Sequence, residues 1–293
     1  MRAPLHRAAA AAAVTIAGLA LVGRAGAAAD ASGPPSNAPA AGTRALTVFA
    51  AASLREPFEA LARVFEARHP GVRVAFNFAG SQELRFQLQQ GARADVFASA
   101  DTVHAGALAQ QGLIAKPRVF VRNQPVLVVP RANPAGLRAF ADLPRARHIV
   151  VGAPDVPIGR YTLAMLDNAR RVQGDAFVKA VTEHIASREL NVRQVLAKVS
   201  LGEADAAIVY RSDAAAAGGA VTAIEIPPGI AVVAEYALAP VTAAAEPALA
   251  RQWCELLASA EGGVVFTRAG FLPGEIASAP AAAPGVPAPG PRP

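Results

Sequence analysis

At several points along the chain, a residue able to donate a hydrogen bond stands where a strand pattern gives way to a helix pattern. The first is Ser53, which follows the apolar run Leu46–Phe49 and precedes residues that recur at helical spacing from Leu54 to Phe65. This pattern predicts that Ser53 is the N-cap of that helix. A helix N-terminus offers unpaired N–H groups and a partial positive charge, so such a junction can bind a small anion without a lysine or arginine.

The same arrangement recurs further along the chain. Taken singly, each instance is more simply a cap, a turn or a buried tyrosine, and only their convergence makes a binding site. The further candidates are Gly80-Ser81 after the alternating strand pattern 72–78, the loop 154–161 ahead of a helix, Asn191–Arg193 at the start of a helix, and Tyr210 at the end of a strand. Gly80 also lets the backbone approach a ligand closely.

Strand and helix patterns alternate along the chain, which is typical of an α/β fold with a mostly parallel sheet covered by helices. The chain can pass between two lobes around 123–129 and again around 229–236, where the strand Ile230–Ala237 rejoins the first lobe. Two crossings place a ligand in a cleft between the lobes. The expected strands are 46–49, 72–78, 95–98, 125–129, 148–151 and 206–209, and the expected helices are 54–65, 81–90, 158–172 and 191–202.

The two ends of the chain have compositions unlike the rest. Residues 1–29 read as a secretory signal peptide, with a basic start, an apolar stretch from Ala8 to Val22 and a small-residue cleavage site within Ala25–Ala29. No cysteine stands at this cleavage site, so we expect export to the periplasm as a soluble protein without a lipid anchor. Residues 30–43 read as a flexible leader, and residues 274–293 as a disordered Pro/Ala-rich tail.

Composition excludes some classes of function. The formal net charge is +6, and it falls to 6 − 3 = +3 without the three arginines of residues 1–29. So mild and evenly spread a charge predicts no nucleic-acid partner. Catalysis by a serine needs a base, but no Gly-x-Ser-x-Gly motif occurs, and no nucleophile motif or metal-ligand spacing includes the histidines that follow the leader. Those histidines are His69, His104, His148 and His184.

A regulator of this fold needs a helix-turn-helix, where this chain has a signal peptide. We therefore predict a binding protein that is not an enzyme, with no cofactor. The lone Cys254 is expected in the core.

Seven blocks in order carry a family resemblance: Phe49–Leu54, Phe78–Ser81, Gly91–Asp101, Asp155–Gly159, Asn191–Arg193, Ala204–Asp213 and Gly270–Phe271. Over about residues 45–273 the chain resembles the periplasmic molybdate-binding proteins of ABC transporters. The resemblance implies a two-lobed class II periplasmic-binding-protein fold, α/β, with the ligand cleft between the lobes. Lobe 1 is then 44–124 plus the return 230–273, and lobe 2 is 125–229. It also implies capture of molybdate or tungstate for an ABC transporter permease, by a protein that we expect to be monomeric.

In that family, two serines donate side-chain and backbone hydrogen bonds, two backbone amides donate from the second lobe, and a tyrosine donates its hydroxyl. By motif these roles fall on Ser53, Ser81, the amides of Ile158 and Val192, and Tyr210. The same five residues hold the molybdenum as an oxyanion, so no residue is expected to ligate a metal cation directly.

The donor set agrees with the chemistry of the ion. Molybdate is a fully deprotonated dianion at neutral pH, so its oxygens only accept. A fixed acceptor in the site would instead suit phosphate, which carries a proton near neutral pH. Sulfate is smaller than molybdate, and tungstate is nearly its size. Sulfate, phosphate or a metal ion therefore stay open as alternative ligands.

Some nearby residues depart from the family pattern or carry charge. Gln82-Glu83 follows Ser81, where family members often have further serine or threonine. The carboxylates Glu83, Asp155 and Glu189 are expected in solvent or in a first helical turn. One pointing into the cleft would instead favour a protonated oxyanion or a metal ion. Two arginines, Arg160 and Arg193, follow the proposed amides and either attract the anion from a distance or are ordinary surface charges.

Overall fold

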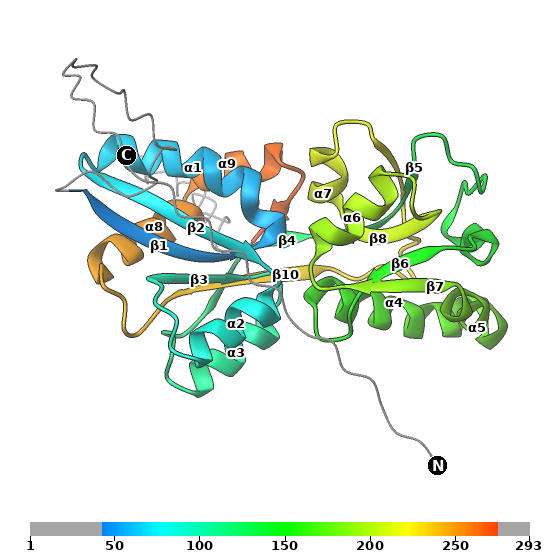
Figure 1. Ribbon diagram of the computed structural model, residues 1–293, viewed down its shortest axis with the longest axis horizontal. Helices are drawn as coiled ribbons and strands as arrows, with labels where there is room; N and C mark the ends of the chain where they lie inside the picture. The colour runs from blue at the N-terminus through cyan, green and yellow to red at the C-terminus, as the bar shows by residue number, and fades with distance from the viewer. Residues whose placement is uncertain (1–42, 275–293) are drawn as a thin grey trace, which may run out of the picture. The chain divides into compact units, whose positions relative to one another are not determined.

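The computed structural model describes residues 43–274, which form two mixed β-sheets flanked by helices (Figure 1). The first sheet has the strand order β11-β4-β10-β3-β1-β2, and the second has the order β7-β6-β8-β5-β9. Each sheet with its helices makes one lobe. The predicted signal peptide, nearly all of the leader, and the tail beyond Gly274 lie outside the described residues.

The first lobe takes its elements from both ends of this range. They are β1 (Arg44–Ala51), the 3-10 turn η1 (Ala52–Leu54), α1 (Arg55–Arg68), β2 (Val72–Ala79), α2 (Ser81–Gln89), β3 (Val96–Ser99), α3 (Thr102–Gln110), β4 (Arg118–Asn123), β10 (Ala234–Pro240), α8 (Pro247–Ala258), α9 (Ala260–Arg268) and β11 (Leu272–Pro273).

The second lobe is one continuous stretch of chain. Its elements are β5 (Pro125–Pro130), the 3-10 helix η2 (Phe140–Arg145), β6 (Ile149–Gly152), α4 (Pro157–Gln173), α5 (Asp175–Glu183), β7 (Ile185–Glu189), α6 (Val192–Ser200), β8 (Ala206–Tyr210), α7 (Arg211–Ala216) and β9 (Val221–Ile224).

The prediction of mostly parallel sheets is wrong, because both sheets are mixed. The parallel pairs are β1 with β2 and β3, and β6 with β7 and β8. The pairs that include β5 or β10 are antiparallel. These two strands enter their sheets directly from the other lobe, so no crossover helix turns them parallel to their neighbours.

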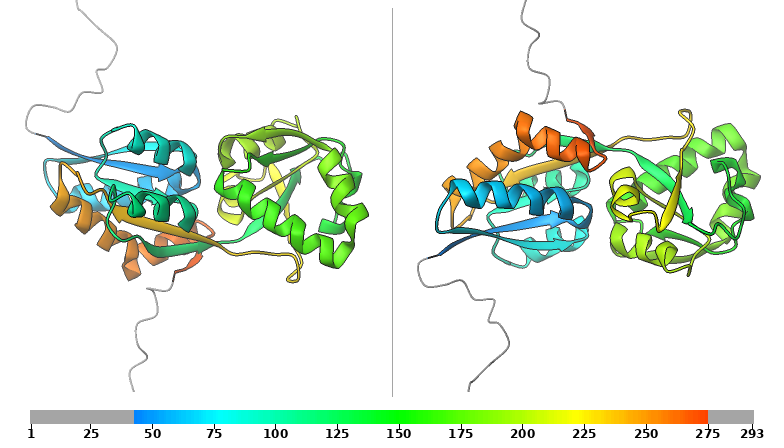
Figure 2. Two further views of the ribbon diagram at one scale, coloured as in Figure 1. Left: turned by 90° about the horizontal axis from the view of Figure 1, so that it is seen from below. Right: turned by 90° about the horizontal axis from the view of Figure 1, so that it is seen from above.

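Two strands, β4 and β10, connect the sheets (Figure 2). The chain leaves the first sheet at Asn123 and enters the second at Pro125, and it returns between β9 and β10. The returning strand begins at Ala234 rather than at Ile230, because the N–H groups of residues 230 and 231 donate to the carbonyl of Pro227 in a turn. The exact lobe boundaries stay a prediction.

Aromatic packing holds α1 against the first sheet and α8. Trp253 of α8 is fully buried and meets Phe58 edge-on at 5.7 Å and Phe65 at 5.4 Å between ring centroids. Cys254 is also buried in this helix, as expected, and burial raises the pKa of its thiol to about 12. Because these contacts fix α1, they also fix the junction between β1 and α1, where Ser53 lies. No helix within residues 43–274 is long and apolar enough to cross a membrane.

Candidate functional site

The five predicted donors line one small cavity between the lobes. The volume of this cavity is only about 10 Å³, which is near the minimum that one water molecule needs. A cavity of this size excludes any ligand larger than a small ion. Its walls are Ala51, Ala52, Ser53, Ala79, Gly80, Ser81 and Ala100 from the first lobe, and Val156, Pro157, Ile158, Asn191, Val192 and Tyr210 from the second.

Ser53 lies on the cavity wall, but the prediction that it caps α1 is wrong. It is the middle residue of the 3-10 turn η1, and Leu54 precedes α1 without any side-chain cap. The tighter turn places Ser53 inside the element instead of before it. Ser53 is only 1% exposed, and its hydroxyl oxygen lies 2.9 Å from the hydroxyl oxygen of Tyr236. Ser53 therefore keeps its place in the site while its local role differs.

Ser81 is the first residue of α2, as the sequence predicted. The N-cap position belongs to Gly80, which makes no side-chain hydrogen bond there. The hydroxyl oxygen of Ser81 accepts a hydrogen bond of 3.0 Å from the backbone N–H of Ala100. Because this oxygen already has a donor behind it, the hydroxyl proton is left to donate elsewhere, and the adjoining space is the cavity.

Ile158 and Val192 lie in the first turns of α4 and α6, where backbone N–H groups have no acceptor within the helix. The side chain of Asn191 accepts from the N–H groups of Arg193 at 3.0 Å and Gln194 at 3.1 Å. That cap leaves the N–H of Val192 for another partner. Ahead of α4, a Cβ on Gly159 would overlap the carbonyl oxygen of Ala153, so only glycine allows the helix to start this close to the loop.

Tyr210 ends β8 and is fully buried, yet its hydroxyl has no hydrogen-bond partner among residues 43–274. Burial raises the pKa of this hydroxyl well above its usual value, so the group stays protonated and can donate. An unpaired buried hydroxyl costs about 1–3 kcal/mol. The cost and the position on the cavity wall together point to a ligand as the missing partner.

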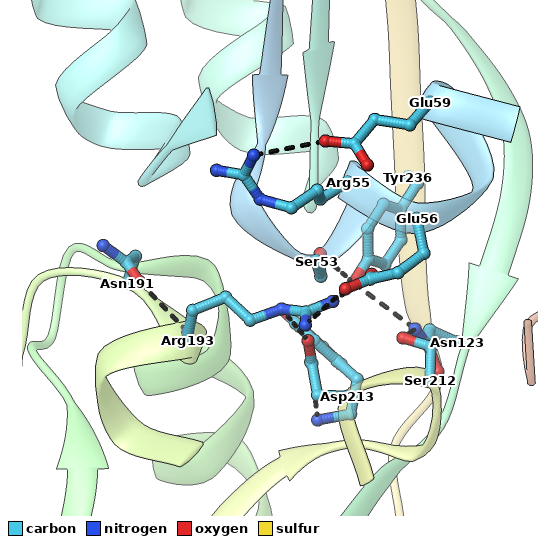
Figure 3. Close-up of polar contacts among 11 residues, drawn as sticks. Ser53, Arg55, Glu56, Glu59, Asn123, Asn191, Arg193, Ser212, Asp213 and Tyr236 are labelled. Carbon is cyan, nitrogen blue, oxygen red and sulfur yellow. Dashed lines mark hydrogen bonds and ion pairs between the residues drawn. The ribbon is translucent and has the colours of Figure 1, made fainter. Parts of the chain in front are cut away.

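The two arginines beside these helix starts each pair with an acid of the first lobe, and Figure 3 shows the contacts of Arg193. Arg193 donates to Glu56 at 2.8 Å and forms an ion pair of 2.9 Å with the buried Asp213. On the other helix, the Arg160 guanidinium lies 3.7 Å from Asp101. Neither arginine lines the cavity. Both are therefore partners of acids across the lobes rather than isolated surface charges.

The three carboxylates near the site do not line the cavity. Glu83 is exposed in the first turn of α2, and Glu189 accepts a hydrogen bond of 2.8 Å from Ser187. Asp155 is exposed, and its backbone carbonyl accepts from the ring Nε2 of His104 at 2.8 Å. Within residues 43–274, no group of three or more histidines, cysteines or acids is placed to hold a metal ion.

Sequence reasoning missed the residues behind Ser53. The hydroxyl of Tyr236, on the connecting strand β10, contacts the Ser53 hydroxyl and lies 3.5 Å from the side-chain nitrogen of Asn123 on β4. The available signal was the rarity of tyrosine, since the three tyrosines of the chain gather here. Tyr210 lies 5.5 Å from Tyr236 and 6.4 Å from Tyr161 between ring centroids.

Comparison with known proteins agrees with this geometry. Residues 46–272 match the family of bacterial extracellular solute-binding proteins. The molybdate-binding protein ModA of Mycobacterium tuberculosis is 42% identical over 245 residues, which cover 82% of this chain and 90% of ModA. The chain therefore belongs to the bacterial extracellular solute-binding proteins, which confirms the prediction of a binding protein rather than an enzyme.

Solved structures show the same two-lobed fold. The sulfate-binding protein SubI of Mycobacterium tuberculosis matches with a TM-score of 0.70 at 23% identity, over 78% of this chain and 87% of SubI. The periplasmic molybdate-binding protein of Azotobacter vinelandii matches with a TM-score of 0.65 at 22% identity, over 78% of this chain and 98% of that protein. At this identity the likeness shows the fold alone, and it confirms the predicted periplasmic-binding architecture.

The buried Asp213 predicts how stability changes with pH. Burial raises the pKa of this carboxyl from 3.8 to about 7, against the opposing effect of Arg193. The native state therefore holds a proton that the unfolded chain has already lost, so this group makes stability fall as pH rises from about 4 to about 7. We expect Asp213→Asn to remove this decrease. Urea unfolding of both proteins across this range, followed through Trp253 fluorescence, measures the slopes. Asp175→Asn, at an exposed position, is the control. Equal slopes in Asp213→Asn and the wild type would contradict the assignment.

Proposed function

We propose that this protein captures molybdate, and also tungstate, outside the cytoplasmic membrane and delivers the anion to an ABC transporter permease. The observation that carries the proposal is a cavity in which every predicted contact is a donor: the hydroxyls of Ser53, Ser81 and Tyr210, and the backbone N–H groups of Ile158 and Val192. The 42% identity to ModA supports molybdate as the ligand.

A donor-only wall suits an ion whose oxygens can only accept. Removing a dianion from water is costly unless each oxygen regains hydrogen bonds, and helix starts supply them without a formal charge. Within residues 43–274 no carboxylate lines the cavity, so no acidic side chain there repels a dianion or rewards a bound proton. These properties favour molybdate over phosphate and argue against a metal cation.

Sulfate is the second candidate, because the fold also matches that of the sulfate-binding protein SubI. Sulfate carries the same charge as molybdate and is likewise acceptor-only near neutral pH, so donor chemistry alone does not separate them. The relative with the higher identity, ModA, is a molybdate-binding protein, whereas the match to SubI is at 23% identity. We therefore assign the preference to molybdate.

We also propose how the chain is organised around this ligand. Lobe 1 comprises 44–124 and 230–273, and lobe 2 comprises 125–229. Export through the segment 1–29 brings the protein to the periplasm, where it acts as a monomer. Ser53 and Ser81 then meet the anion from one lobe, while the helix starts and Tyr210 meet it from the other. Binding favours the closed arrangement by the difference in its affinity for the closed and open states.

The ligand assignment predicts a selectivity order. Molybdate and tungstate should bind at least about a hundredfold tighter than sulfate, a gap of roughly 2.7 kcal/mol, and tighter still than phosphate. Isothermal titration calorimetry of the purified protein with the four anions, at one pH and ionic strength, measures this order. Equal or tighter sulfate binding would reject molybdate as the ligand and leave the fold assignment intact.

Substitution of the buried tyrosine tests the site itself. Tyr210→Phe removes one donor with little change in shape, and a lost hydrogen bond to a charged group costs about 1.5–3 kcal/mol, roughly ten- to a hundredfold in affinity. Ser53→Ala should weaken binding similarly from the opposite wall. The matched control is Tyr161→Phe, since the Tyr161 hydroxyl accepts from the backbone N–H of Glu235 outside the cavity wall. Wild-type molybdate affinity in Tyr210→Phe would show that this hydroxyl does not bind the ligand.

Closure can be tested without touching a donor. A Cβ added at Gly80 would overlap the carbonyl oxygen of Leu190 in the other lobe, which the side-chain nitrogen of Gln82 already contacts at 2.7 Å. Gly80→Ala should therefore act as a wedge that costs the closed state about 1–3 kcal/mol. Small-angle scattering at one subsaturating molybdate concentration should show less compaction than in the wild type. Gly106→Ala, whose Cβ meets open space, is the control. Unchanged affinity and compaction in Gly80→Ala would refute closure at this contact.

A further inference from the structure

We propose that Asn123 and Tyr236 orient the Ser53 hydroxyl so that its proton points into the cavity, and that these two residues thereby select fully deprotonated oxyanions over protonated ones. The inference deepens the proposed function and rests on it. Neither residue lines the cavity, so both act through Ser53 as positioning residues.

The direction of this chain of hydrogen bonds is fixed at Asn123, which is fully buried on the connecting strand β4 (Figure 3). Its side-chain oxygen accepts from the backbone N–H of Gln124 at 2.9 Å, and that N–H can only donate. The amide nitrogen therefore faces the other way. It donates to the hydroxyl of Ser212 at 2.8 Å and more weakly to that of Tyr236 at 3.5 Å.

Tyr236 must then donate to Ser53. The amide nitrogen of Asn123 offers no lone pair, so it cannot take the proton of Tyr236. Among the described residues, the Ser53 hydroxyl oxygen at 2.9 Å is the other hydrogen-bond partner of the Tyr236 hydroxyl. Burial raises the pKa of Tyr236 well above its usual value, so the proton is present at any physiological pH.

The proton of Ser53 is consequently directed away from Tyr236 and towards the cavity. A ligand oxygen that accepts it completes the chain from Asn123 through Tyr236 and Ser53 to the anion. A ligand hydroxyl that donated to Ser53 would instead leave the serine proton without this acceptor, at the cost of an unpaired buried donor. The N–H of Ala100 donates to the hydroxyl oxygen of Ser81, so the proton of Ser81 is likewise free to point into the cavity. Both serines of the first lobe thus face the ligand as donors.

The test is a double-mutant cycle with Tyr236→Phe, Ser53→Ala and the double variant, each titrated by calorimetry with molybdate and with inorganic phosphate at pH 6, where phosphate is protonated. We expect Tyr236→Phe to weaken molybdate binding by about three- to tenfold and phosphate binding by less, so that the ratio of the two affinities falls. In the Ser53→Ala background, the same substitution should leave the ratio unchanged, because its effect passes through Ser53. A loss of packing alone would weaken both anions by a similar factor.

A second variant reverses the direction of the hydrogen bonds. In Asn123→Asp, the side-chain nitrogen becomes an oxygen that accepts from Tyr236, so that Ser53 can donate to the tyrosine and accept from the ligand. The molybdate-to-phosphate ratio should fall here as well. Tyr161→Phe, which alters the third tyrosine of the group, should leave the ratio at its wild-type value. Urea unfolding followed by Trp253 fluorescence shows that each variant is folded before titration.

Three results would overturn the inference: an unchanged ratio in the folded Tyr236→Phe variant, an equal fall of the ratio in the Ser53→Ala background, or an equal fall in Tyr161→Phe. The outcome is separable from that of the proposed function. If the wild type prefers sulfate to molybdate, the molybdate assignment fails, and the sulfate-to-phosphate ratio tests the role of Tyr236 in the same proteins. If the wild type binds no oxyanion, both fail.

Discussion

The structure depends on one constraint: hydrogen-bond donors are held in a small closed cavity without partners of their own. A buried donor without a hydrogen-bond partner lowers the stability of the fold. Several such donors in one place therefore indicate a functional use, such as binding a ligand. The Tyr210 hydroxyl is the clearest instance, because the part of the chain that the structure describes supplies it with no acceptor. The starts of α4 and α6 add backbone N–H groups that no helix can pair internally. In the proposed function, one doubly charged oxyanion accepts from all of these groups and is the partner that they lack within the protein.

These donors point into the cavity because neighbouring groups form hydrogen bonds with them, or with the groups next to them, on the side away from it. The side chain of Asn191 accepts from the second and third N–H groups of α6 and leaves the first, that of Val192, without an acceptor in the helix. The backbone N–H of Ala100 donates to the hydroxyl oxygen of Ser81. The cations beside the cavity are likewise engaged: Arg193 pairs with Glu56 and Asp213, and Arg160 lies near Asp101. Positive charge is therefore used to join the lobes, while neutral dipoles are left for the anion. Such a division suits a carrier that must also release its ligand, since a direct arginine contact would hold a dianion more tightly.

Local pattern located the segments that form most of the cavity wall, and the family resemblance then assigned the amides of Ile158 and Val192 within them. Ser81, Ile158, Val192 and Tyr210 stand at helix starts or a strand end, which depend on residues nearby in the sequence. Local pattern failed where the outcome depended on distant pairing. The antiparallel entry of β5 and β10 follows from where the chain crosses between sheets, and no periodicity encodes it. The contact between Ser53 and Tyr236 joins positions 183 apart, and it became visible only when β10 took its place beside β3 and β4.

The residues that orient Ser53 also lie on the two strands that connect the sheets, with Asn123 at the end of β4 and Tyr236 near the start of β10. A motion of the second lobe relative to the first must be absorbed near these strands, since the chain passes between the sheets there. The partner of Asn123 in the second lobe, Ser212, is the second residue of α7, the short helix that follows β8 and also carries Asp213. The amide of Asn123 is held from within the connection itself by Gln124 and from the second lobe by Ser212. The proposed proton direction at Ser53 is therefore set at the point where the chain passes between the two lobes.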